Sequence, residues 1–200
     1  MKKILSLSAI LLTAALAFMG CKQQVEEQNT DPFSDCSESV TSIEMSDGTW
    51  TITTSDTSAY GNISYTSDVT YKATVSDGAL TITSGTTKMV MKTKDVLGDA
   101  YSSYTALSAT EKEEVNKEFL AELKNSFGPS YGTVTEATMN DENISITLEL
   151  SSTMLAYAEQ MFNPANLPSG STIKTNSDKT KYIITVTTED KTLIYYATKD

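Results

Sequence analysis

The residue types that most often carry out catalysis are scarce in this chain. Its 200 residues include no histidine, and all fifteen basic residues are lysines. Histidine is the commonest general base and metal ligand, and arginine supplies the bidentate clamp for carboxylates and phosphates. A serine nucleophile needs a base beside it, and this composition offers no histidine for that role. We therefore predict that the protein is not an enzyme and has no catalytic residues.

Acidic side chains are more abundant, and the formal net charge is −11. They cluster at 111–114 and at 141–142. A calcium-binding loop needs oxygen ligands at regular spacing, and neither cluster has that spacing. Both clusters are typical of solvated surface, so we predict no metal site and no cofactor. A chain this acidic is also a poor partner for nucleic acid.

One cysteine is placed where a covalent modification would occur. Lys2 and Lys3 begin a positively charged leader, residues 4–19 are mostly apolar, and Gly20 puts a small residue directly before Cys21. The run 17–21, Ala-Phe-Met-Gly-Cys, resembles the lipobox of bacterial lipoproteins. The resemblance implies cleavage between Gly20 and Cys21. It also implies that Cys21 carries diacylglycerol and a further acyl chain such as palmitate.

A lipidated Cys21 would decide where the protein is located. Two or three acyl chains hold a protein stably on a bilayer, at about 0.8 kcal/mol per buried methylene, without any transmembrane helix. By the same resemblance, Lys22 after the cysteine favours the outer membrane or the cell surface over the inner membrane. We therefore expect a lipid-anchored protein of the cell envelope, with the membrane as one partner.

The domain organisation follows from the composition. Residues 1–20 form the leader, and residues 21–35 form the lipidated cysteine with a polar, acidic and aperiodic tether. Residues 36–200 are enough for one domain with its own core. Cys36 is then the one remaining thiol, and a half-buried position at the start of the domain is favoured over a cross-link to another chain.

Most of that domain has the alternating pattern of β-strands. Residues 49–53 place Trp50 and Ile52 on one face, with threonines on the other. Residues 69–75 alternate likewise, and Asp77-Gly78 is the strongest short hairpin signal in the chain. Further strands are predicted around 80–82, 89–91, 132–137 and 144–150, and a closing hairpin joins 182–186 to 193–197.

Two segments have helical periodicity instead, near 96–127 and 152–162. Ser108 and Glu111 have the spacing of a capping box. Val115, Phe119, Leu123 and Phe127 then follow at steps of four and form one apolar stripe. Gly128-Pro129 is predicted to end this helix.

The predicted fold is mainly β with inserted helices (α+β), with about eight mostly antiparallel strands. The residues alone leave two architectures open, a closed barrel and a curled open sheet with helices on one face. Gly48-Thr49-Trp50 is similar to the Gly-x-Trp signature that opens lipocalin-like barrels. That resemblance implies an eight-stranded barrel with an internal apolar cavity, closed at one end by Trp50.

Four residues are candidates for ligand contact: Trp50, Tyr71, Met89 and Met91. Aromatic rings offer stacking area with a polar tip, and methionine adapts to irregular apolar shapes. Core packing is the alternative role for each of them. The predicted function is binding of a small apolar or amphipathic ligand in a β-barrel cavity. The alternative is a structural or adhesin-like lipoprotein whose Ser/Thr-rich surface contacts another envelope or host component; the sequence names no protein partner.

Overall fold

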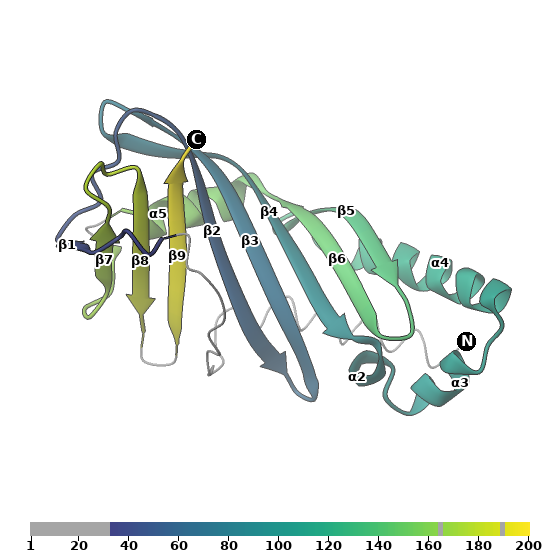
Figure 1. Ribbon diagram of the computed structural model, residues 1–200. Helices are drawn as coiled ribbons and strands as arrows, with labels where there is room; N and C mark the ends of the chain where they lie inside the picture. The colour runs from purple at the N-terminus through teal and green to yellow at the C-terminus, as the bar shows by residue number, and fades with distance from the viewer. Residues whose placement is uncertain (1–32, 164–165, 189–190) are drawn as a thin grey trace.

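The computed structural model describes residues 33–163, 166–188 and 191–200. In these residues nine strands form one antiparallel sheet, in the order β1-β7-β8-β9-β2-β3-β4-β6-β5 (Figure 1). The predicted α+β class with antiparallel strands is confirmed. The strands are β1 Glu38–Val40, β2 Gly48–Tyr60, β3 Ile63–Ser76, β4 Ala79–Lys92, β5 Gly132–Met139, β6 Asn143–Leu150, β7 Thr172–Thr175, β8 Lys181–Thr187 and β9 Thr192–Lys199.

The sheet is open, so the curled open sheet is the correct one of the two predicted architectures and the lipocalin-like barrel is wrong. A barrel closes only if its first and last strands pair. Here β1 and β5 are the two edges and lie at opposite ends of the sheet (Figure 1). The helical segment between β4 and β5 returns the chain so that α4 (Ala109–Ser126) packs against β5. The other edge strand, β1, is only three residues long.

Two long hairpins form the centre of the sheet, where β2 pairs with β3 and β3 with β4. Asp77 and Gly78 connect β3 to β4 with φ values of 52° and 75°, as a tight hairpin turn with positive φ at both positions requires. The predicted strands at 80–82 and 89–91 are two halves of β4. The apolar pattern is interrupted between them because the inward-facing positions of β4 there hold Gly85 and Thr87. The Thr87 hydroxyl is buried and lies 3.2 Å from that of Ser67 on β3.

The predicted helix near 96–127 is divided into short pieces before α4. These are α2 (Thr93–Leu97), the 3-10 turn η2 (Gly98–Ala100) and α3 (Tyr101–Thr105). The capping box of α4 is confirmed: the Ser108 hydroxyl accepts from the Glu111 N–H at 3.4 Å, and the Glu111 carboxylate accepts from the Ser108 N–H at 2.9 Å. The second predicted helix is α5 (Ser152–Met161), whose Ser151 hydroxyl accepts from the Met154 N–H.

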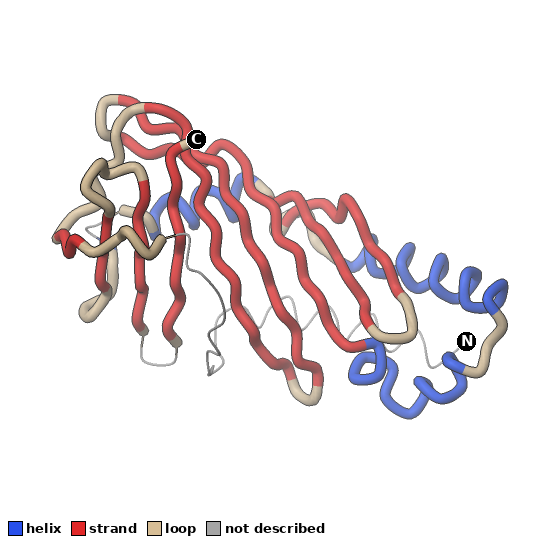
Figure 2. Tube along the Cα trace, in the orientation of Figure 1, coloured by secondary structure: helices blue, strands red, loops and turns tan. Residues whose placement is uncertain are grey.

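α4 and α5 lie behind the sheet in the view of Figure 2, and the face toward the viewer is formed by strands. We call the helix-covered side the inner face. Its buried side chains form two groups. The α5 cluster contains Met45, Trp50, Ile52, Tyr71, Ala73, Val75, Ile82, Ala158, Phe162, Ile173, Tyr182, Ile184, Tyr195 and Ala197. The α4 cluster contains Ile63, Tyr65, Met89, Met91, Val96, Tyr104, Phe119, Leu123, Met139, Ile144, Ile146 and Leu148.

The described chain begins at Phe33, three residues ahead of the predicted domain start at 36. The Phe33 ring lies 5.0 Å from that of Tyr196, and the Asp35 carboxylate pairs with Lys181 at 3.1 Å. Cys36 is buried, rather than half-buried as predicted, and its Sγ lies 3.7 Å from the Lys181 carbonyl oxygen.

The leader, Gly20, Cys21 and most of the predicted tether lie outside the described residues. Within the described part of the chain, no helix is both long and apolar enough to span a membrane.

Candidate functional site

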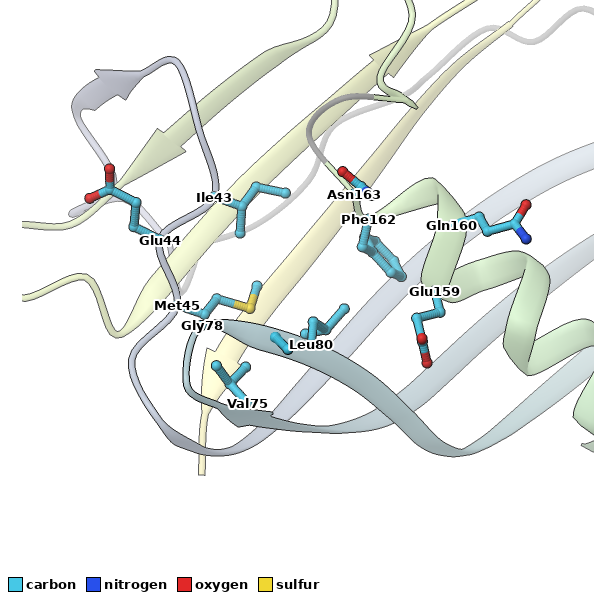
Figure 3. A pocket seen from close by; sticks show the side chains of 11 residues that line it. Ile43, Glu44, Met45, Val75, Gly78, Leu80, Glu159, Gln160, Phe162 and Asn163 are labelled. Carbon is cyan, nitrogen blue, oxygen red and sulfur yellow. The ribbon is translucent and has the colours of Figure 1, made fainter.

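A pocket of about 580 Å³ opens where three parts of the chain meet (Figure 3). They are the β3–β4 hairpin, the C-terminal end of α5, and the loop between β1 and β2, which we call loop 41–47. The volume is in the range of small-molecule sites. The lining residues are Ile43, Glu44, Met45, Val75, Gly78, Ala79, Leu80, Glu159, Gln160, Phe162 and Asn163.

The apolar wall of the pocket is an extension of the α5 cluster. Phe162 and Met45 are buried members of that cluster, and Ile43 and Leu80 are half-buried beside it. Phe162 meets the rings of Tyr71 and Tyr195 edge-on, with centroids 5.9 and 5.1 Å away, an arrangement that aromatic pairs favour. The wall therefore belongs to the packed core and is preformed.

Burial also keeps the two supporting tyrosines uncharged. It raises the pKa of the Tyr71 hydroxyl to about 12. The pKa of the Tyr195 hydroxyl is raised as well, chiefly by burial and further by Tyr71 beside it. Removing a phenolate from water is unfavourable, so the layer beneath Phe162 stays neutral at physiological pH.

Loop 41–47 is held in place by side chains of the sheet. The Trp50 indole Nε1–H donates to the Ser46 carbonyl at 3.0 Å, and the Tyr182 hydroxyl donates to the Glu44 carbonyl at 2.8 Å. The Glu44 carboxylate pairs with Lys179 at 2.5 Å. The hydrogen bond from Lys179 is the main reason that the pKa of Glu44 lies below its usual value. These contacts fix Ile43 and Met45 at the pocket wall.

Glu159 is the half-buried acid of the pocket. Its carboxylate accepts a hydrogen bond from the Ile82 N–H at 3.0 Å. β6 pairs with β4 only over Thr86–Lys92, so the backbone of Ile82 faces no strand on that side. A buried backbone N–H needs a partner, and Glu159 supplies it from α5. The described lining residues include no lysine.

The four sequence-predicted ligand residues do not come together, and none of them lines this pocket. Trp50 and Tyr71 belong to the α5 cluster and support the pocket through Ser46 and Phe162. Met89 and Met91 lie in the α4 cluster. All four are buried, with at most 8% of their surface exposed.

The residues that do line the pocket carry weak sequence signals. Ile43 and Met45 are short apolar interruptions in a polar stretch, and Phe162 is the C-cap residue that directly follows α5. A pattern confined to each segment cannot show that the three segments converge. Among the described residues, no three of the His, Cys, Asp and Glu type are grouped closely enough to hold a metal ion.

Comparison of the chain with known protein families, curated proteins and solved structures found no match. The pocket offers an apolar wall, one half-buried carboxylate and an amide-bearing rim, with no nucleophile and base side by side among the lining residues. This arrangement is suited to binding.

Proposed function

We propose that this protein is a lipid-anchored protein of the cell envelope that binds a small apolar or amphipathic ligand in the pocket between loop 41–47, the β3–β4 hairpin and α5. The single observation that supports it best is a preformed cavity of about 580 Å³ with an apolar wall and a few polar groups, the usual character of a ligand site. This pocket replaces the barrel interior expected from the sequence.

Displacement of a neutral, polarity-sensitive dye tests ligand binding. We expect the full chain to bind Nile red and to release it when decanol is added. Ile43→Asp places a charge on the apolar wall of the pocket and should weaken dye binding by about tenfold or more, the equivalent of about 1.4 kcal/mol. Ile43 is half-buried on a loop, so this change disturbs the core little.

Ile194→Asp is the matched control, because Ile194 is a half-buried isoleucine of β9 that does not line the pocket. It should leave the dye affinity unchanged. Equal weakening by both variants, or no dye binding by the wild-type chain, would contradict the proposed site.

The proposed anchor has a test of its own. Cells supplied with labelled palmitate should label the wild-type protein, and Cys21→Ser should abolish the label because the acceptor sulfur is removed. Labelling retained in Cys21→Ser would overturn the anchor without affecting the pocket.

A second candidate function is contact with another envelope or host component through the outer face of the sheet. The observation that favours it is that no described helix packs on the outer face of β2, β3 and β4, where Thr, Ser, Asp and Lys alternate with the core positions. Crosslinking on intact cells would test it: a crosslink from Thr70 to a second protein supports this function, and protection from protease without any crosslink contradicts it.

A further inference from the structure

The charges around the pocket indicate which head group an amphipathic ligand carries. We infer that the pocket prefers a cationic amphiphile, an apolar chain that ends in an ammonium group, over neutral and anionic amphiphiles of the same length. This inference rests on the proposed function, because it concerns the ligand of the same pocket.

Glu159 is the group that would receive the cation. It lies on the α5 side of the pocket, whereas Ile43 and Met45 lie on the loop side (Figure 3). Phe162 lies on the α5 side together with Glu159, and the ion-paired Glu44 lies on the loop side, so Glu159 stands next to the apolar wall. A chain that packs against Met45 and Phe162 would bring its head group toward the Glu159 carboxylate.

The other acid of the pocket contributes little of this preference. Glu44 is already compensated, since its carboxylate pairs with Lys179 at 2.5 Å. Glu159 has a backbone N–H, that of Ile82, as its partner. A dipole of that kind stabilises a carboxylate without cancelling its net charge. Glu159 therefore keeps an attraction for a ligand cation that Glu44 has largely lost.

The lysines near the pocket do not make it attractive to an anionic head group. Lys179 is bound by Glu44, and Lys199 Nζ donates to the Ser46 hydroxyl at 2.9 Å; neither lines the pocket. The whole chain carries a formal charge of −11. A carboxylate head group would therefore meet a second carboxylate in a partly desolvated site, where like charges repel strongly.

The experiment compares three probes of equal chain length, decylammonium, decanol and decanoate, in Nile red displacement from the full chain. We expect decylammonium to bind most tightly, about tenfold more tightly than decanol, as one partly exposed ion pair allows. Decanoate should bind most weakly. Concentrations are kept below those at which the probes form micelles.

Glu159→Gln then removes the charge while its amide oxygen can still accept from the Ile82 N–H. We expect this variant to bind decylammonium and decanol with equal affinity, so that the preference for the cation is lost. Glu149→Gln is the matched control, because Glu149 is exposed on β6 and does not line the pocket. It changes the net charge by the same amount and should keep the preference for decylammonium.

The outcomes separate the two claims. Decanol binding with no preference for decylammonium, or with decanoate bound more tightly, would overturn the cationic head group and leave the proposed function standing. Loss of the preference in Glu149→Gln as well would show that the overall charge causes it and would overturn the role of Glu159. Binding of none of the three probes would overturn both claims. The ranking in the wild-type chain decides the inference even if Glu159→Gln unfolds.

Discussion

Trp50 shows how a buried side chain can shape a site without lining it. It has no exposed surface, packs near Tyr182 with ring centroids 5.8 Å apart, and donates its indole N–H to Ser46 in loop 41–47. The sequence predicts Trp50 and Ile52 on one face of a strand, and both are buried there. The barrel end that Trp50 is predicted to close does not exist in the open sheet. The pattern could not show that the polar atom of Trp50 would hold a loop, because that contact depends on how the loop folds back.

Trp50→Phe tests this role. The substitution removes the donor to Ser46 and some buried volume, so we expect the free energy of unfolding to fall by about 1–3 kcal/mol. Urea unfolding followed by circular dichroism measures it. Tyr101→Phe is the control, because the Tyr101 hydroxyl donates to the Asp141 carbonyl at an exposed site. An equal loss in both variants would contradict the role assigned to Trp50.

Two ion pairs of different exposure give a second prediction. The side chains of Lys191 and Asp56 pair with only 16% and 12% of their surface exposed, whereas those of Lys72 and Asp200 are 52% and 36% exposed. Removing one partner of a buried pair leaves a desolvated charge, and exposed pairs contribute little. We expect Lys191→Met to lower the free energy of unfolding, measured in urea, by about 3 kcal/mol. Lys72→Met should lower it by less than about 1 kcal/mol. Similar costs for both would show that Asp56 is solvated in the folded protein.

The buried tyrosines predict how stability depends on pH at the alkaline end. An unfolded tyrosine ionises near pH 10, and burial raises the pKa of Tyr71 to about 12. The folded protein therefore holds this proton more tightly than the unfolded chain does. The resulting stability is fully present below pH 10 and is lost as the pH rises from about 10 to about 12, by roughly 2–3 kcal/mol for this one group.

Urea unfolding at several alkaline pH values measures this loss. Tyr71→Phe should have a shallower decline than the wild-type protein over the same interval. Identical declines would show that Tyr71 ionises in the folded state as it does in water.

At the scale of single elements, local sequence patterns predict turns and helix caps correctly but miss short strands and the full length of long ones. The hairpin at Asp77-Gly78 and the cap of α4 are confirmed, because each depends on neighbours in the chain. β1 and β7, with three and four residues, are too short for a period to be recognised. The long strands β2 and β3 extend beyond the predicted strands, because Thr54, Ser58 and Ser67 are polar residues at buried positions.

The packing of α5 against β4 depends on Gly85. A Cβ at this position would lie 2.9 Å from Leu150 Cδ1, 2.9 Å from Leu155 Cδ2 and 3.0 Å from Tyr71 Cδ1. We expect Gly85→Ala to destabilise the protein by about 1–3 kcal/mol through overpacking, and to weaken dye binding because Tyr71 supports Phe162. Thermal unfolding and Nile red titration measure the two effects.

Gly128→Ala is the matched control for this change. Its Cβ would meet only the Ser130 hydroxyl oxygen, at an ordinary contact distance of 3.8 Å. Its effect on stability and on dye binding should be small. If Gly85→Ala is no more harmful than Gly128→Ala, α5 does not pack as closely on β4 as the structure indicates.

At the scale of the whole molecule, the properties that the sequence predicts poorly are those that depend on distant segments. Period-two strands predict a sheet, but its openness depends on whether β1 and β5 meet, and no local pattern encodes that. The pocket has the same character, since residues 43–45, 75–80 and 159–163 converge only in the folded chain. The prediction of the ligand residues depends on side-chain type alone, and the structure places two of the four in each cluster.

The whole molecule nevertheless has a consistent organisation. One face of the central strands carries the helices and both clusters, and the other consists of threonine-rich strands. The pocket is lined by residues at the C-terminal end of α5 and by no residue of α4 (Figure 3).

The measurement that tests the proposed pocket most directly is a map of backbone amide chemical shifts as decylammonium is added to the isotopically labelled protein. The largest changes should fall at residues 43–45, 78–80 and 159–163, with residues 89–91 and 144–148 of the α4 cluster unchanged. Changes concentrated in the α4 cluster, or no change at any concentration below micelle formation, would contradict the pocket as the ligand site.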